Sequence, residues 1–373
     1  MHRKKPTNKI QQLPNLRMLG KGNPQKENTM TTKPLFPIML AGLVAIGCTQ
    51  SENEEGTQDN SPTTEDDNQQ ETENGFEDEK QGEGKEDYEE GEEGSEECNN
   101  AADSNFRTIV RGSETREFIL HIPSSYDSST PTPLIINFHG FGGCATDFAD
   151  TIGNYYNLNN LADSENIIVA YPQGITRAKG APEWDPADPS STQSITENDV
   201  LFTRELVAEV SSELNVDSDR VYATGYSNGG MMVYGLACNA ADLIAAGGIM
   251  SGIMLGTACE GDEFISLIHF HGIGDDALPY DGSGDFISVE QTVDIMLSHN
   301  NIPSDSLVTT QRNGGNVVHD VYSGGSEGTS FELYTVHSEH GKEGGHVWFS
   351  EEIDGDSPNQ ILWDFLSTYN LND

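Results

Sequence analysis

Apolar and polar positions follow two different periods from residue 106 onward. Residues 106–110 and 116–122 alternate between apolar and polar side chains on either side of a Gly-Ser pair, a pattern typical of an antiparallel hairpin. Residues 134–139 and 167–171 are instead almost continuously apolar, as strands buried on both faces are. The patterned part of the chain therefore predicts a hairpin followed by buried strands.

Segments with a helical period separate these strands from further ones. Helices are expected at residues 157–165, 199–215, 288–299 and 361–369. Further apolar runs predict strands at residues 221–224, 246–250, 264–270 and 331–336, with residues 317–322 as the hairpin partner of the last. Apolar strands that alternate with helices indicate an α/β fold, a mostly parallel sheet with helices on both faces.

The chain before residue 98 shows only one apolar run. Residues 1–29 are basic and polar, and we expect them to be a dispensable extension upstream of a true start at Met30. Residues 30–48 have a short basic start, an apolar run and a terminal cysteine, which is typical of a secretory signal peptide. The apolar run is too short to span a bilayer.

The end of that signal, Val44-Ala45-Ile46-Gly47-Cys48, resembles a bacterial lipobox. The resemblance implies that Cys48 is acylated and anchors the protein to the outer membrane, at the cell surface. Ala45 departs from the pattern, since such boxes usually have Leu there. The alternative is an ordinary cleaved signal with an incidental cysteine, and both interpretations predict a protein outside the cytoplasm.

Residues 49–97 consist mainly of Glu, Asp, Gly, Asn, Gln, Ser and Thr. Such a segment cannot bury enough apolar surface to offset the entropy lost on ordering, and its negative charges repel one another. We therefore expect an acidic disordered tether, followed by a catalytic domain over residues 98–373.

Net charge narrows the range of partners. The chain carries a formal charge of -43, and residues 99–373 contain 9 Lys and Arg against 40 Asp and Glu. A domain so acidic repels nucleic acid and anionic lipid, so neither is an expected partner. A membrane is expected only through the lipid anchor.

A candidate nucleophile stands in Gly225-Tyr-Ser-Asn-Gly229, between a predicted strand and a helix-forming segment. This sequence fits the G-x-S-x-G nucleophile elbow, in which a serine on a strained strand-to-helix turn projects its hydroxyl above the sheet. Side chains at the two glycine positions would clash across so tight a turn. Ser227 is therefore the candidate nucleophile.

A serine hydroxyl is a poor nucleophile without a histidine base and a carboxylate that orients the base. Asp275 and Asp276 follow a predicted strand and are the candidate acids, although both could be turn formers only. His346, in a glycine-rich loop after the last strand, is the candidate base, with His337 and His340 as nearby alternatives.

Backbone donors are needed for the oxyanion that forms on an ester carbonyl. The loop His139-Gly-Phe-Gly-Gly143 follows the strand expected beside the elbow strand, and its glycines let the backbone approach a substrate. We expect the amides of Phe141 and Asn228 to form the oxyanion hole. The alternative for such a loop is a plain tight turn.

Six motifs stand along the chain in one order: His139-Gly-Phe-Gly-Gly, Tyr171-Pro-Gln-Gly, Asn198-Asp-Val, Gly225-Tyr-Ser-Asn-Gly-Gly, His271-Gly-Ile-Gly-Asp with Pro279-Tyr280, and Gly345-His-Val-Trp. Together they resemble the secreted esterase family of poly(3-hydroxybutyrate) depolymerases and feruloyl or acetyl xylan esterases. The resemblance covers about residues 98–370 and implies an α/β-hydrolase fold.

This resemblance also selects among the candidate side chains. In the family the acid is the first aspartate after H-G-x-x, which implies Asp275, and the histidine is the one before Trp, which implies His346. Ile273 and Leu278 stand where the family often has Thr and Val. Neither departure touches the implied catalytic residues.

Four cysteines remain when Cys48 is assigned to the lipobox. In an exported protein an even number suggests disulfides, and four cysteines permit three pairings. The family pattern implies the pairs Cys238–Cys259 and Cys98–Cys144. Buried free thiols are the alternative.

No cofactor or metal is expected. His139, His269, His271 and His346 are the residues from which a zinc site could be built. They lack H-E-x-x-H or any close paired spacing, and three of them belong to motifs at strand ends.

The sequence therefore predicts an exported, monomeric serine ester hydrolase. Trp184, Tyr280 and Trp348 are candidate walls of a pocket for an aromatic or apolar acyl group, with ordinary core or rim positions as the alternative. The expected substrates are feruloyl or acetyl esters of polysaccharides, because the chain has a tether where solid-polyester degraders usually carry a binding module.

Two other functions remain open. One is hydrolysis of polyhydroxybutyrate or its oligomers. The other is a surface lipoprotein that binds carbohydrate and keeps the fold without turnover. A binding protein needs no Ser, His, Asp and glycine-loop set, so the residues themselves favour an enzyme.

Overall fold

A computed structural model describes residues 98, 106–149, 157–177, 180–186, 198–256, 258–284, 286–337 and 344–372. The expectations for residues 1–97 lie outside these residues. Within them, no helix is both long and apolar enough to cross a bilayer.

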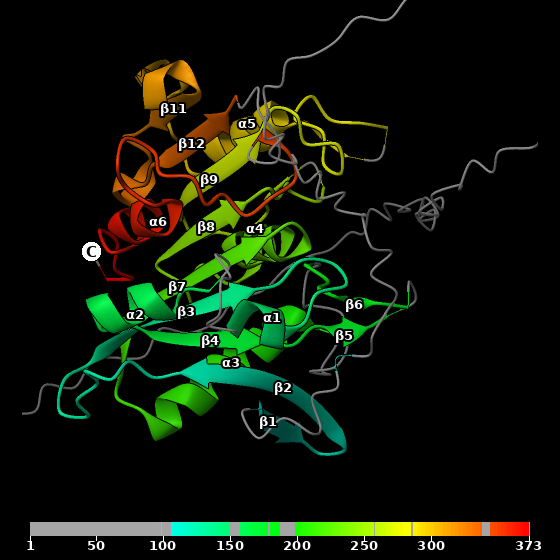
Figure 1. The fold of residues 1–373 in the computed structure, drawn as a ribbon, viewed down its shortest axis with the longest axis vertical. Helices are drawn as coiled ribbons and strands as arrows, with labels where there is room; N and C mark the ends of the chain where they lie inside the picture. The colour runs from blue at the N-terminus through cyan, green and yellow to red at the C-terminus, as the bar shows by residue number, and fades with distance from the viewer. Residues whose placement is uncertain are drawn as a thin grey trace, which may run out of the picture. The chain divides into compact units, whose positions relative to one another are not determined.

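A ten-stranded sheet is the frame of the described residues, and its strand order is β1-β2-β4-β3-β7-β8-β9-β12-β11-β10. Figure 1 shows the strands following one another from β2 near the bottom to β12 near the top. The strands are β1 (Phe106–Arg111), β2 (Glu114–His121), β3 (Thr132–Phe138), β4 (Ile168–Pro172), β7 (Val216–Tyr226), β8 (Ala246–Met250), β9 (Ser266–Gly272), β10 (Val308–Arg312), β11 (Val317–Tyr322) and β12 (Phe331–Val336). A second small sheet pairs β5 (Ile175–Thr176) with β6 (Pro182–Glu183).

The middle of the sheet is parallel, from β4 through β3, β7, β8 and β9 to β12. Every residue of β3, β4, β8 and β9 is buried, which explains why these strands read as continuous apolar runs. Antiparallel hairpins close both sides, with β1 and β2 beside β4, and β11 and β10 beside β12. The predicted α/β fold with a mostly parallel sheet is confirmed.

Helices cover both faces of the sheet. They are α1 (Ala145–Ala149), α2 (Asn159–Glu165), α3 (Asp199–Glu213), α4 (Asn228–Asn239), α5 (Val289–His299) and α6 (Pro358–Leu366), with short 3₁₀ turns at Ser304–Ser306, Asn313–Gly315 and Ser326–Gly328. Neighbouring residues of β3 belong to different cores: Ile136 lies in the core that includes residues of α3, α4 and α5, whereas Ile135 lies in the core that includes residues of α1, α2 and α6. The sheet therefore separates two hydrophobic cores.

Some boundaries differ from those read from the sequence. Helix α6 begins at Pro358 rather than residue 361, because Ser357 accepts a hydrogen bond from the Gln360 amide and proline suits the first helical turn. Strand β10 was not predicted, since its five residues are mostly exposed and carry no apolar alternation. It forms through backbone pairing with β11.

Two disulfides join the cysteine pairs implied by the family pattern. Cys98 pairs with Cys144 and Cys238 pairs with Cys259, with Cα atoms 5.7 and 5.1 Å apart. Disulfides persist in oxidising compartments, so both pairs fit an extracellular protein.

Candidate active site

Ser227 occupies the turn between β7 and α4 in a conformation that few residues adopt. Its φ is 54° and its ψ is -118°. A Cβ on Gly225 would lie 2.3 Å from the Gly229 carbonyl oxygen, and a Cβ on Gly229 would lie 2.2 Å from the Phe138 carbonyl oxygen. The two glycines are therefore required by the turn and by its contact with β3.

Ser227, His346 and Asp275 form one hydrogen-bonded chain. The Ser227 hydroxyl donates to His346 Nε2 at 2.8 Å, and His346 Nδ1 donates to Asp275 Oδ2 at 2.8 Å. Ser227 follows β7 and Asp275 follows β9, and these parallel strands end at the same edge of the sheet. His346 reaches them from the segment after β12.

Asp275 is held as a buried carboxylate, with 4 % of its surface exposed. Oδ1 accepts hydrogen bonds from the amides of Ala277 at 3.0 Å and Leu278 at 2.7 Å. Burial raises the pKa of the Asp275 carboxyl, but hydrogen bonds from His271 and His346 outweigh it and lower the pKa well below the usual value. Asp275 therefore stays ionised.

The described alternatives, Asp276 and His337, do not join this chain. Asp276 is exposed to solvent. His337 directly follows β12 and donates its backbone amide to the Asn316 carbonyl, while His340 lies outside the described residues.

His346 is oriented by a second contact. The Tyr226 hydroxyl donates to the His346 carbonyl oxygen at 2.8 Å, and the two rings lie 5.2 Å apart. Tyr226 is the residue next to the candidate nucleophile, so the elbow itself holds the loop that carries the histidine.

The loop at residues 139–143 lies against the elbow. A Cβ on Gly140 would be 3.0 Å from the Tyr226 ring and 3.4 Å from Ser227 Cβ. Asn228 is the first residue of α4, where backbone amides have no partner within the helix. Backbone donors are therefore available from the helix end beside Ser227.

The His139 side chain holds the start of that loop through hydrogen bonds of both ring nitrogens. Its Nδ1 donates to the Gly140 carbonyl at 2.7 Å, and its Nε2 accepts from the Gly174 amide at 2.9 Å. Complete burial lowers the pKa of His139 to about 4. The ring is therefore neutral, and each nitrogen has a defined role.

Trp184 and Trp348 are core residues, contrary to the expectation that they wall a substrate pocket. Trp184 is 2 % exposed and its indole donates to the His139 carbonyl at 2.9 Å. Trp348 is 0 % exposed and its indole donates to Asn359 at 2.9 Å. Both indoles are turned inward, and each N–H donates to an acceptor within the fold. Tyr280 is partly exposed, and its place in a pocket stays a prediction.

Trp184 has a different position that the sequence did not reveal. Its backbone N–H donates to Asn228 Oδ1 at 2.7 Å, and Asn228 Nδ2 donates to the Trp184 carbonyl at 3.1 Å. This reciprocal pair ties the segment after β6 to the first residue of α4. Trp184 therefore holds the first residue of α4, which is next to Ser227.

A buried ion cluster anchors the same segment. Asp199 accepts from Arg116 at 2.8 Å and from Arg177 at 2.6 Å. The Asp185 amide donates to Asp199 at 2.7 Å, directly after Trp184. The Asn198-Asp-Val motif was the one sequence signal for this cluster, and nothing in the sequence identified the two arginines as its partners.

The described residues include no group of three or more His, Cys, Asp or Glu side chains that could hold a metal ion. His269 and His271 bond to one another at 3.1 Å, and His346 bonds to Ser227 and Asp275. The four histidines considered for zinc thus have other partners.

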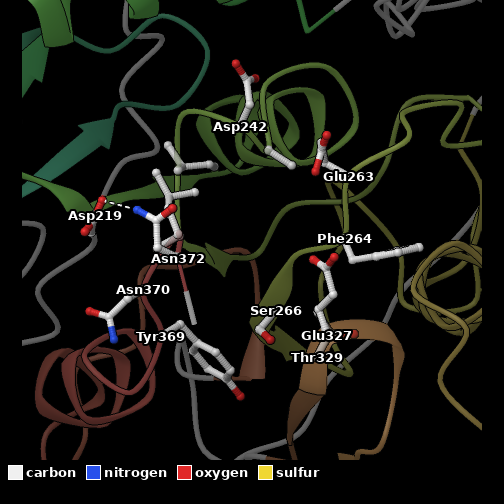
Figure 2. Close-up of a pocket in the computed structure, with 14 residues that line it drawn as sticks. Asp219, Asp242, Glu263, Phe264, Ser266, Glu327, Thr329, Tyr369, Asn370 and Asn372 are labelled. Atoms are coloured by element: carbon white, nitrogen blue, oxygen red, sulfur yellow. Dashed lines mark hydrogen bonds between the residues drawn. The ribbon is translucent and has the colours of Figure 1, made fainter. Parts of the chain in front are cut away.

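A cavity of about 340 Å³ lies at the opposite edge of the sheet from Ser227 (Figure 2). Its walls include residues just before or at the start of β8 and β9, whereas Ser227 follows the end of β7. The lining residues labelled in Figure 2 include the acidic residues Asp219, Asp242, Glu263 and Glu327. Asn372 Nδ2 donates to Asp219 at 2.6 Å. This cavity is separate from the Ser227 site.

Known proteins with similar sequences are esterases. The sequence profile of the family described as Esterase PHB depolymerase matches residues 117–300. Feruloyl esterase C of Emericella nidulans is 31% identical over 254 residues, which cover 67% of this chain and 83% of that protein. A probable feruloyl esterase C of Aspergillus terreus is 27% identical over 260 residues, which cover 69% and 86%.

A solved structure shares the fold. The acetyl xylan esterase from Aspergillus awamori superposes with a TM-score of 0.51 and 14% identity, over 70% of this chain and 98% of that one. Together with the sequence relatives, this identifies the ten-stranded sheet as an α/β-hydrolase sheet. The chain belongs to the α/β-hydrolase family of polyhydroxybutyrate depolymerases and feruloyl esterases, and it is a carboxylic ester hydrolase.

Proposed function

We propose that Ser227, His346 and Asp275 are the catalytic triad of this ester hydrolase. The observation that carries the proposal is the hydrogen-bonded chain from the Ser227 hydroxyl through His346 to the Asp275 carboxylate, with both bonds at 2.8 Å. Such a chain lets the imidazole take the serine proton while the carboxylate fixes the tautomer and stabilises the imidazolium.

The reaction has two halves. Ser227 Oγ attacks the ester carbonyl carbon as His346 Nε2 takes its proton, and the tetrahedral intermediate then expels the alcohol, which receives that proton. The acyl group is left on Ser227. His346 next takes a proton from water, the hydroxide attacks the acyl-serine, and the acid is released as Oγ regains its proton.

The amides of Phe141 and Asn228 are proposed to donate to the oxyanion in both halves. Their placement is supported by the contact of the 139–143 loop with Ser227 and by the position of Asn228 at the start of α4. Donors of this kind are each worth about 10²–10³ in turnover.

Feruloyl or acetyl esters on polysaccharides are the proposed substrates. Two curated relatives that match more than four fifths of their own length bear the name feruloyl esterase C, which supports this class. Polyhydroxybutyrate or its oligomers are the second candidate, because the matching family profile is described as a PHB depolymerase.

A hydrolysis panel tests the function and the substrate class together. The full chain and Ser227→Ala are compared on methyl ferulate, acetylated xylan, a 3-hydroxybutyrate oligomer and p-nitrophenyl butyrate. We expect a preference for methyl ferulate or acetylated xylan and no turnover by Ser227→Ala. Preference for the oligomer would assign the protein to polyester turnover, and turnover by Ser227→Ala would refute the triad.

The sequence alone also left open a binding lipoprotein without turnover. It predicts that the wild-type chain hydrolyses none of the four esters yet still binds polysaccharide. The same panel therefore separates it from the enzyme.

We also propose that the protein is exported, monomeric and anchored through an acylated Cys48. The two disulfides support export, and the residues that would carry the anchor lie outside the described part of the chain. Metabolic labelling with a fatty-acid analogue should mark the wild-type chain and not Cys48→Ser. Equal labelling would rule out this anchor, and light scattering measures the oligomeric state.

A further inference from the structure

A line of three buried polar side chains leads from α4 to the Asp275 carboxylate. The Tyr234 hydroxyl lies 3.0 Å from His269 Nδ1, and His269 Nε2 lies 3.1 Å from His271 Nδ1. His271 Nε2 lies 2.9 Å from the Leu278 carbonyl and 3.3 Å from Asp275 Oδ2. None of the three side chains has more than 1 % of its surface exposed.

The fold brings these groups together from two elements. His269 and His271 are two residues apart on β9, so they point to the same face of the sheet. Tyr234 comes from the middle of α4, the helix that begins at the elbow. The line therefore connects α4, which follows Ser227, to β9, which precedes Asp275.

The acceptors at its end fix the position of the hydrogens. His271 Nε2 faces two oxygen atoms that only accept, the Leu278 carbonyl and the Asp275 carboxylate, so Nε2 carries a hydrogen. The other ring nitrogen, Nδ1, then accepts from His269 Nε2–H. His269 Nδ1 in turn accepts from the Tyr234 hydroxyl, and every group in the line has one hydrogen to donate.

Burial keeps Tyr234 and His269, the two residues of the line farthest from Asp275, from titrating. It raises the pKa of the Tyr234 hydroxyl well above its usual value. It also lowers the pKa of His269 well below its usual value, with His271 acting in the same sense and a hydrogen bond to Gly252 opposing it. Tyr234 and His269 therefore stay neutral over the pH range in which esterases work.

We propose that Tyr234, His269 and His271 are positioning residues for ester hydrolysis, which hold the His271 Nε2–H against the Asp275 oxygen that also accepts from His346. This proposal rests on the proposed catalytic triad. An oxygen with two donors is a weaker base than an oxygen with one. The extra donor therefore keeps the proton on His346 when that ring becomes an imidazolium.

An alternative purely structural role would not need polar groups here. Buried polar side chains are unfavourable unless every group is hydrogen-bonded, and apolar residues would fill the same volume. Both surrounding elements are rich in buried apolar residues, including Leu236 on α4 and Phe270 on β9. Packing alone therefore does not explain why these three buried positions are polar.

The other titratable groups near His271 are few among the described residues. Asp275 Oδ2 lies 3.3 Å from His271 Nε2 and also accepts from His346, and the ring of Tyr280 lies 5.9 Å from the His271 ring. The Tyr280 hydroxyl is bonded to Thr335 at 3.1 Å and is therefore turned to β12.

The test begins with Tyr234→Phe, which removes one hydroxyl and keeps the ring. Its matched control is Tyr222→Phe, which removes a hydroxyl bonded to the Tyr369 carbonyl at 2.9 Å, five residues before Ser227 on β7. With p-nitrophenyl butyrate and the full chain, we expect Tyr234→Phe to lower kcat about fivefold with KM unchanged, since one hydrogen bond is worth about 1 kcal/mol. Tyr222→Phe should leave both constants within about twofold of wild type.

The second pair of variants separates positioning from packing. His271→Leu removes the donor, and we expect kcat to fall about 100-fold, as the loss of a hydrogen bond to a charged group predicts. His271→Gln keeps an amide N–H within reach of Asp275. Its kcat should therefore be at least about tenfold higher than that of His271→Leu, because a hydrogen bond to the carboxylate is restored. The acidic limb of kcat/KM should move to higher pH in His271→Leu, because an Asp275 carboxylate with one donor fewer attracts the proton that it shares with His346 more strongly.

Each result decides the matter. Wild-type kcat in Tyr234→Phe would overturn the proposal, even if the His271 variants did not fold. Equal losses in His271→Gln and His271→Leu, with an unmoved acidic limb, would assign these residues to packing. Full activity in Ser227→Ala would instead refute the proposed triad, and the positioning role would fall with it.

Discussion

Asp199 and Asp275 are both buried aspartates, yet their partners differ in charge. Asp199 bonds the guanidinium groups of Arg116 and Arg177 at 2.8 and 2.6 Å. Asp275 bonds imidazoles and backbone amides instead. A carboxylate paired with permanent cations is fixed in charge, whereas one held by neutral donors responds when a neighbouring imidazole gains a proton. The partners, and not burial, therefore separate a structural carboxylate from a reactive one.

The two aspartates also act on different sides of Ser227. Asp275 orients His346, while Asp199 holds the segment of Trp184, which bonds to Asn228 and His139. Loss of the first should therefore appear as a slow reaction in a stable protein. Loss of the second should appear mainly as an unstable protein.

The largest effect is expected from Asp275→Asn. The amide cannot accept from His346 Nδ1–H with the strength of a carboxylate and favours the wrong tautomer, so kcat should fall about 10⁴-fold. Steady-state kinetics with p-nitrophenyl butyrate measures it. A fall of less than tenfold would mean that Asp275 is not the triad acid.

Asp199→Asn should act on stability instead. It removes the carboxylate that pairs with the buried Arg116 and the partly buried Arg177, and breaking such a pair costs about 3–5 kcal/mol. Urea denaturation gives the free energy of unfolding, and kcat per folded molecule should stay within about tenfold of wild type, since the reacting groups are untouched. An unchanged unfolding midpoint would contradict the structural role.

His139 should make the free energy of unfolding sensitive to acid. Its pKa is lowered from 6.5 to about 4 in the folded chain, so the unfolded chain binds more protons between these values. Stability should therefore fall by about 3 kcal/mol as pH decreases from 6.5 to 4, at about 1.4 kcal/mol per unit. The difference between wild type and His139→Asn, measured by urea denaturation across this window, isolates the effect. A constant difference would contradict the neutral His139.

Asp276→Asn should have the smallest effect. Asp276 is exposed and lies next to Asp275 in sequence, so it is the matched control for the triad acid. We expect kcat, KM and the unfolding midpoint within about twofold or 0.5 kcal/mol of wild type. A large loss of activity here would exchange the two assignments.

The fold was largely predictable because the parallel strands are buried on both faces. Strands β8, β11 and β12 begin and end at the predicted residues, and both flanking hairpins that involve apolar alternation follow the pattern. Strand β10 was missed, since VTTQR is exposed and its pairing depends on β11 alone.

The site was predictable only where a motif dictates backbone geometry. Ser227 and its glycines follow from the turn, and Asp275 and His346 follow from the family resemblance. Arg116 and Asp199 are 83 positions apart, and no local pattern connects them. The inward turn of Trp348 depends on an acceptor at Asn359, which a motif cannot show.

Covalent labelling of Ser227 tests the central claim most directly. A fluorophosphonate reacts with a serine only when a base activates its hydroxyl and an oxyanion site receives the phosphonyl oxygen. Peptide mapping of the labelled full chain should place one adduct on Ser227 of the wild type, with loss of esterase activity in proportion, and none on Ser227→Ala. An adduct on another residue, or none in an active wild type, would contradict the proposed triad.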